Sequence, residues 1–185
     1  MKKSPVALSK CSSYDIEKLT LLLENQFRDA GITKDLINQK NVVIKPNLVM
    51  NKEPEFAATT HPSVIAAAAR VLKKMGAAKI TIAESSGGPY TEATIKAHYK
   101  GCGITEMALD EGIDLNTKNG ATVMHYPDGV KCKTFNIIDP ITEADVIVNI
   151  CKLKTHSLTK MSAGTKNLFG CIPGATMPET KVIDT

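Results

Sequence analysis

The segment from Ala144 to Gly174 holds a dense set of side chains that could do chemistry. Its polar residues alternate with glycines and include Lys152, Lys154, His156, Lys166 and Asn167. Lysine pairs with phosphate or carboxylate, and histidine exchanges a proton near neutral pH. From residue 151 to residue 174 the chain has four lysines and no aspartate or glutamate. This local positive charge predicts a small anionic ligand.

Lys166 and His156 are the two candidate catalytic residues of this segment. Neighbouring Lys152 and Lys154 would lower the pKa of Lys166 and make it a nucleophile, or Lys166 would simply pair with an anion. His156 could be a general base or a metal ligand, and Asn167 could orient either side chain. The plainer alternatives are a surface lysine and a histidine with a structural hydrogen bond.

Two further groups of polar residues follow predicted strands. Lys45 and Asn47 stand at the end of the apolar run 41–45, and Glu84, Ser85 and Ser86 follow the run 79–83. The carboxyl ends of parallel strands meet at one edge of a sheet, which is where ligands bind in open α/β sheets. We therefore expect these residues and the 152–167 segment to converge on one ligand-binding edge.

The remaining histidines and the cysteines give weaker signals. His61 precedes Pro62 and is expected to begin a helix, whereas His98 and His125 are expected to be surface or hairpin residues. The five cysteines are widely spaced without a CxxC pair, which predicts reduced thiols rather than disulfides or a self-contained metal cluster. Glu84 with one histidine gives too few ligands to identify a metal.

The elements that position these residues alternate between strands and helices. Apolar runs predict strands at 5–9, 41–45, 79–83 and 146–150, the last buried on both faces. Apolar stripes predict helices at 15–30, 62–75, 91–99 and 104–111, with a helical turn at 140–144. Asp128-Gly129 predicts a hairpin between 122–126 and 130–137. The expected fold is α/β, a mainly parallel sheet with helices on both faces and one added β-hairpin.

Composition narrows the class of protein further. The 185 residues are 43% hydrophobic and 23% charged, as in an ordinary globular domain, and we expect residues 1–185 to form a single domain. The sequence has neither a membrane-length apolar stretch nor a signal peptide, which predicts a cytoplasmic protein without membrane contact. With a net charge of +4 and 4% aromatic residues, no nucleic-acid partner is expected.

Five segments together resemble the domain-of-unknown-function 362 family. They are KPNL at 45–48, THP at 60–62, GAAKITIAE at 76–84, EADVIVNICKLKTH at 143–156 and KNLFG at 166–170. Members of that family are often described as iron–sulfur proteins, so the resemblance implies a redox enzyme with a ferredoxin-like domain or subunit. The family pattern continues beyond Thr185, so we expect a carboxyl-terminal continuation. An iron–sulfur cluster would lie there or on a partner.

A more distant similarity links the chain to the amino-terminal domain of the nickel-pincer lactate racemases. His156 and Lys166 have the spacing of that family's catalytic histidine and its cofactor-bearing lysine, and Pro173-Gly174 follows. The family's second catalytic histidine falls where this chain reads Ser86-Gly87-Gly88-Pro89. The similarity thus implies a shared scaffold and ligand edge, without two-base racemisation.

Two functional hypotheses of different classes follow. The first is an iron–sulfur-linked redox enzyme, or a racemase-like enzyme that uses Lys166 and His156, acting on a small anionic substrate. The second is a non-catalytic module that holds an anionic ligand or cofactor through lysines and backbone N–H groups. The sequence identifies neither substrate, reaction, metal, cofactor nor oligomeric state.

Overall fold

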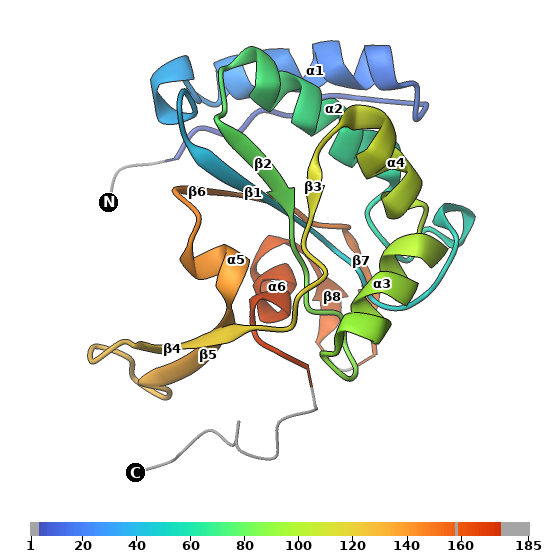
Figure 1. Ribbon diagram of the computed structural model, residues 1–185. Helices are drawn as coiled ribbons and strands as arrows, with labels where there is room; N and C mark the ends of the chain where they lie inside the picture. Colours follow the sequence, from blue (N-terminus) through green and yellow to red (C-terminus); the bar gives the residue numbers. More distant parts are fainter. Residues whose placement is uncertain (1–3, 158, 175–185) are drawn as a thin grey trace.

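Four parallel strands form the central sheet in the order β3-β2-β1-β6 (Figure 1). The computed structural model describes residues 4–157 and 159–174. The strands are β1 (Asn41–Pro46), β2 (Lys79–Ile82), β3 (Asp114–Leu115) and β6 (Val146–Ile150). The order changes direction beside β1, because β2 and β3 lie on one side of it and β6 lies on the other.

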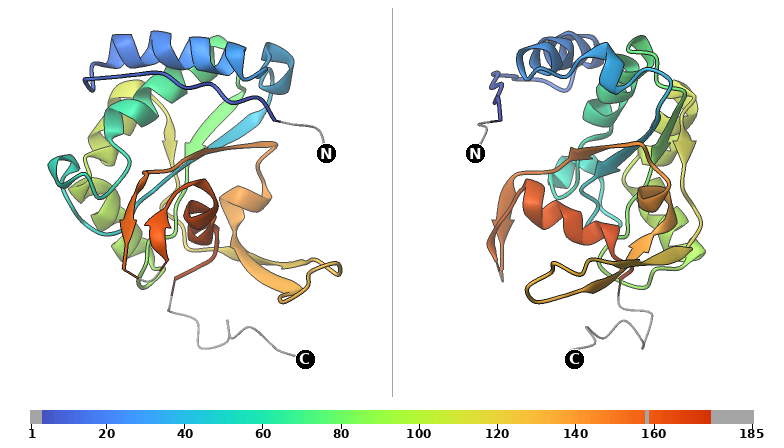
Figure 2. Two further views of the ribbon diagram at one scale, coloured as in Figure 1. Left: turned by 180° about the vertical axis from the view of Figure 1, so that it is seen from behind. Right: turned by 90° about the vertical axis from the view of Figure 1, so that its left-hand side faces the viewer.

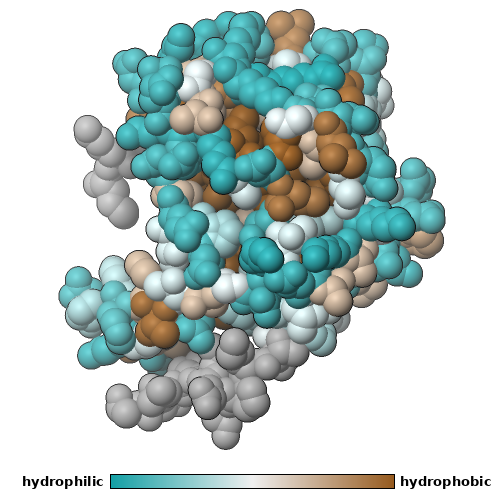
Figure 3. Space-filling view, viewed as in Figure 1, coloured by the Kyte–Doolittle hydropathy of each residue, from teal (hydrophilic) through white to brown (hydrophobic). Residues whose placement is uncertain are grey.

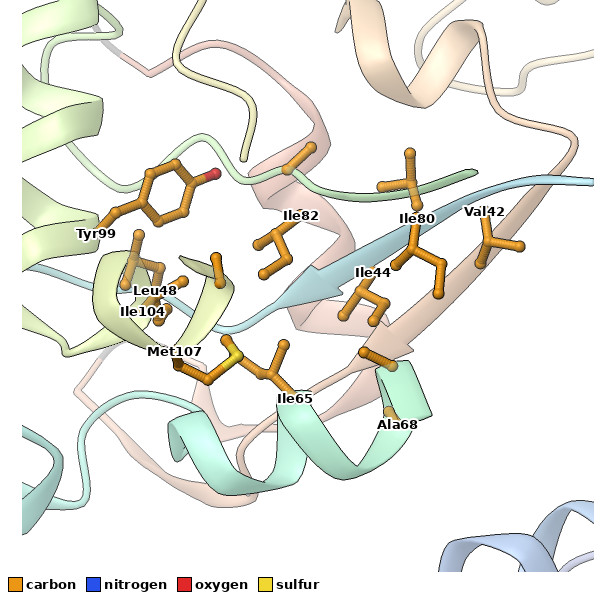
Figure 4. Close-up of a cluster of buried hydrophobic side chains, with 14 of the residues drawn as sticks. Val42, Ile44, Leu48, Ile65, Ala68, Ile80, Ile82, Tyr99, Ile104 and Met107 are labelled. Carbon is orange, nitrogen blue, oxygen red and sulfur yellow. The ribbon is translucent and has the colours of Figure 1, made fainter. Parts of the chain in front are cut away.

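One face of the sheet packs against α2 (Pro62–Lys74). Ile65 and Ala68 of α2 lie below Ile44 and Ile80 of the sheet in the close-up of the core (Figure 4). Helix α1 (Ile16–Asp29), capped by Asp15, packs against α2 as an outer layer (Figure 2). The alanine-rich middle of α2 is fully buried between these two layers, since small side chains allow close packing.

Helices α3 (Glu92–Gly101) and α4 (Ile104–Glu111) extend this core beyond the sheet. Gly103 separates them with a φ of 69°, a left-handed conformation that favours glycine. Tyr99 and Ile104 are fully buried on either side of this break. Helix α4 packs against α2, α3 and β3.

Two short helices, α5 (Asp139–Thr142) and α6 (Gly164–Asn167), lie on the other face. Side chains alternate along a strand, so Lys45 and Asn149 point away from α2, and Asn149 bonds to α6 through Gly164 O at 2.9 Å. Because both helices are short, apolar surface remains visible over the sheet on the face of Figure 1 (Figure 3).

Two antiparallel hairpins complete the part of the fold that the structure describes. The first joins β4 (Ala121–His125) to β5 (Thr134–Ile138), and the second joins β7 (Lys154–His156) to β8 (Lys160–Ser162). Three 3₁₀ turns lie at Lys34–Leu36, Pro54–Phe56 and Leu168–Cys171.

The predicted α/β class and mainly parallel sheet are confirmed, whereas three local predictions are wrong. Residues 5–9 form no strand, and Val6 and Leu8 are almost fully exposed, because the apolar run is too short to bury a face. β6 is an edge strand with half-buried or exposed side chains rather than a strand buried on both faces. The sequence predicts one added hairpin, whereas the described residues form a second one, β7–β8, within the 152–167 segment.

Candidate functional site

A cavity of about 570 Å³ opens at the carboxyl ends of the strands. It is lined by residues from all three segments that were expected to converge: 47–49, 84–87, and 154–157 together with 162, 166, 167, 169, 170 and 172–174. The cavity lies beside β1, where the strand order changes direction. Ligands bind at such topological switch points because the loops diverge there and leave a crevice.

The floor of this cavity is a buried pair formed by Lys45 and Glu84. Lys45 Nζ donates to a carboxylate oxygen of Glu84 and, at 3.2 Å, to Pro46 O. Lys45 is fully buried and Glu84 is 4% exposed. Gly170 packs directly on the pair, because a Cβ there would overlap the Glu84 carboxylate. Lys45 therefore lies beneath the cavity, where it pairs with Glu84 rather than reaching a ligand.

Burial sets the proton affinity of Glu84. Removal from water raises the pKa of this carboxyl group to about 8, against the opposing effects of Lys45, Lys166 and Lys154. A carboxyl group with this pKa gains and loses a proton near neutral pH. Glu84 can thus act as an acid or a base at the cavity floor.

Lys154 is the cavity lysine that is most firmly held. Its Nζ donates to Asn47 Oδ1 at 2.5 Å and to the carbonyl oxygen of Ala58. Burial lowers the pKa of Lys154, and repulsion from Lys152 and Lys166 lowers it further.

Lys166 and His156 lie on the wall of the same cavity. Lys166 Nζ is 5.0 Å from the centroid of the Phe169 ring, a cation–π distance. His156 Nδ1 accepts a hydrogen bond from Thr159 N at 3.2 Å, which leaves Nε2 as the position for the proton of the neutral ring. On β7, Lys154 and His156 are two residues apart and so share one side of the strand.

Asn167 connects the elements that surround the cavity. Its Nδ2 donates to Asn149 Oδ1 at 2.7 Å and to Pro46 O at 3.2 Å, and its Oδ1 accepts from Asn47 Nδ2 at 3.0 Å. The residue is 5% exposed. Its amide is therefore used mainly to fix α6 against β1 and β6.

The two serines after β2 have different partners. Ser85 Oγ accepts from Gly174 N at 2.9 Å, which fixes the 173–174 segment at the cavity rim. Ser86 Oγ lies 2.5 Å from His98 Nδ1, a contact that sequence reasoning missed. The signal was present, because His98 follows Ile95 by three residues and therefore shares its inward face of α3.

Two of the proposed ligand-binding residues do not line the cavity: Lys45 lies beneath it, and Lys152 points to other partners. Its Nζ lies 3.1 Å from Tyr14 Oη. The Tyr14 ring stacks on His61 with centroids 3.7 Å apart. His61 also caps α2 by accepting from Ser63 N at 3.2 Å, which confirms its predicted role at a helix start.

No metal centre or membrane segment is evident in the described residues. Within 4–157 and 159–174, no three histidine, cysteine, aspartate or glutamate side chains are grouped closely enough to hold a metal ion. No helix in the same ranges is long and apolar enough to cross a membrane.

Comparison with known proteins gives a family and one distant relative. Residues 42–182 match the family described as "Domain of unknown function (DUF362)". The chain is 26% identical over 174 residues to the thylakoid-associated protein sll1697 of Synechocystis sp., and the match covers 91% of this chain. It covers 51% of that protein, so the chain spans about half the length of this relative. No solved structure gives a significant match.

Proposed function

The chain belongs to the DUF362 family, whose function is unknown, and on that premise we propose that it binds a small carboxylate- or phosphate-bearing anion at the carboxyl edge of its sheet. One observation carries the proposal. Lys154 and Lys166 line the cavity, and Glu84, the acidic residue among its described lining, is already paired with Lys45. The cavity therefore has an excess of positive charge.

The partners of the lysines support an anion in preference to a cation. Lys154 is held by neutral oxygen atoms of Asn47 and Ala58, so its positive charge is oriented without being neutralised. Charge-assisted hydrogen bonds of lysine to phosphate or carboxylate are about twice as strong as neutral ones. A half-buried cavity also screens such contacts less than open solvent does.

Anion binding is tested by titration calorimetry with inorganic phosphate, pyrophosphate, lactate and malonate as separate probes. Lys154→Gln and Lys166→Gln should each weaken binding of the best probe by roughly tenfold or more, since a hydrogen bond to a charged group contributes about 1.5–3 kcal/mol. Lys160→Gln is the matched control, because exposed Lys160 lies on neighbouring β8 and does not line the cavity. Equal effects of all three substitutions, or no binding of any probe, would contradict the proposal.

A racemase-like enzyme that uses Lys166 and His156 is the second candidate function. The observation that favours it is that both side chains line one cavity of about 570 Å³. Intact-mass and metal analysis of protein purified without oxygen tests this candidate. A mass increment that maps to Lys166 supports it, and an unmodified chain without metal contradicts it.

We also propose the iron–sulfur-linked redox role, which requires a further domain or a partner subunit. The described residues contain no metal-binding group, so an iron–sulfur cluster would be supplied by a ferredoxin-like domain or subunit. We also keep the cytoplasm as the proposed location. The relative's description as thylakoid-associated makes membrane attachment the competing outcome, and cell fractionation with detection of this chain distinguishes the two.

A further inference from the structure

A serine and a histidine meet at the edge of the anion cavity. Ser86 lines the cavity and is 6% exposed, and its Oγ is 2.5 Å from Nδ1 of His98 on α3. A serine hydroxyl is a weak nucleophile by itself, and a histidine within hydrogen-bonding distance activates it by accepting its proton.

The position of His98 suits the role of a base. α3 is fixed by its Thr91 cap, which accepts from Thr94 N at 3.2 Å, and by buried Ile95 and Tyr99 on the same face as His98. Partial burial lowers the pKa of His98, which favours the neutral imidazole, the form that can accept a proton.

The backbone beside Ser86 is open to a ligand. A Cβ added at Gly87 or Gly88 would meet no atom of the residues that the structure describes within 4 Å. Neither glycine N–H donates a hydrogen bond to another described residue. Free N–H groups next to a nucleophile can stabilise the negative oxygen that forms during acyl transfer.

We propose that Ser86 and His98 form a nucleophile–base pair that hydrolyses small esters or thioesters whose acyl part carries a carboxylate or phosphate group. The inference rests on the proposed function, because Lys154 and Lys166 would hold the charged group of the substrate in the same cavity. It assigns a reaction to the Ser86-Gly87-Gly88 loop.

The reaction needs no further cofactor. Ser86 Oγ attacks the acyl carbon, and its proton moves to His98 as the new C–O bond forms. The bond to the alcohol or thiol then breaks, and His98 returns the proton to that leaving group. Water next attacks the serine ester as His98 accepts its proton. The acyl–Oγ bond then breaks and His98 returns that proton to Ser86 Oγ, which releases the carboxylic acid and restores both residues.

The competing role of this contact is to anchor the loop to α3. A comparable contact elsewhere in the chain supplies a matched control. His125 Nδ1 lies 3.3 Å from Thr134 Oγ1 on the exposed β4–β5 hairpin, away from the residues that line the cavity. A reactive hydroxyl should therefore depend on His98 and be independent of His125.

The first experiment is labelling with an uncharged fluorophosphonate, followed by peptide mass spectrometry of the parent protein. The expected label lies on Ser86, its rate falls at least tenfold in His98→Gln, and it is unchanged in His125→Gln. A label on another residue, no label, or equal labelling of His98→Gln would overturn the proposal. Because the label is mapped on the parent protein, the result does not depend on whether Ser86→Ala folds.

The second experiment separates this inference from anion binding. The p-nitrophenyl monoester of succinic acid should be hydrolysed faster than the neutral p-nitrophenyl acetate, and Lys166→Gln should remove that preference while leaving fluorophosphonate labelling intact. Phosphate or malonate binding without Ser86 labelling would refute only the inference. Ser86 labelling without binding of any anion, and without preference for the charged ester, would refute the proposed function and with it the proposed substrate class.

Discussion

The buried pair of Lys45 and Glu84 is the residue-scale feature that most distinguishes this site from a solvated basic loop. The two side chains occupy the cavity floor with almost no exposure. A buried ion pair must offset a large desolvation cost, so such pairs contribute little net stability. The raised pKa of Glu84 means that this carboxyl group can hold a proton beside the cavity.

The raised pKa of Glu84 gives a prediction for stability against pH. The folded-state pKa is about 8 and the ordinary value is 4.5, so between these limits the folded protein holds a proton that the unfolded chain has lost. Stability is then fully present below about pH 4.5 and falls as pH rises toward 8, by on the order of 1 kcal/mol for each pH unit.

Urea unfolding at pH 5, 6.5 and 8 measures this slope. Glu84→Gln should flatten it, because the substituted amide does not titrate. The control is Glu24→Gln, a surface glutamate whose carboxylate accepts from Lys74 Nζ at 2.9 Å, and it should keep the parent slope. A parent protein whose stability does not change over this range would refute the assignment of a raised pKa to Glu84.

At the scale of elements, the site depends on how α6 and β7 pack against the ends of β1 and β6. α6 spans only Gly164–Asn167, too short to be stable alone. Its position is fixed by side-chain hydrogen bonds, among which those of Asn167 reach both strands. The wall that carries Lys166 is thus held by the side-chain amides of Asn167 and Asn149.

Asn167→Asp tests that dependence. The carboxylate would remove a donor that faces Asn149 Oδ1 and Pro46 O, and it would bring a negative charge against these acceptors. Leaving buried acceptors unsatisfied costs about 1–3 kcal/mol in the free energy of unfolding. Asn119→Asp is the control, because Asn119 is exposed. Equal loss in both variants in chemical denaturation would contradict this role for Asn167.

At the scale of the whole molecule, the cavity collects charge from separate parts of the chain. Lys154 lies on β7, Lys166 lies on α6, and Glu84 follows β2. Each lysine alone would be an ordinary surface cation. Together they produce a positive region of the kind that attracts anions.

Ionic strength should therefore modulate binding of the best anionic probe. Raising KCl from about 0.05 M to about 0.5 M shortens the Debye length to a few ångströms and should weaken binding several-fold. Calorimetric titrations at three KCl concentrations measure the effect, with Lys166→Gln expected to show a shallower dependence than the parent protein. Binding that does not respond to salt would argue against recognition by the lysine charges.

Much of the fold could be predicted from the chain because local patterns were strong. The apolar stripe of 104–111 predicted α4, and Pro62 after His61 predicted the start of α2. Asp128-Gly129 predicted the β4–β5 hairpin. The β7–β8 hairpin was not predicted, because its strands have three residues each and are mainly polar. The two-residue strand β3 exists only through its pairing with β2.

The candidate site, like the fold, could be predicted only in part from the sequence. The sequence alone determined which polar segments follow the strands, and parallel strands require those segments to meet at one edge. The tertiary structure decided the rest: Lys45 is enclosed by Glu84, Lys152 points to Tyr14, and Ser86 meets His98. Order along the chain fixes which edge a residue reaches, whereas its partner and burial depend on packing between segments that are far apart in sequence.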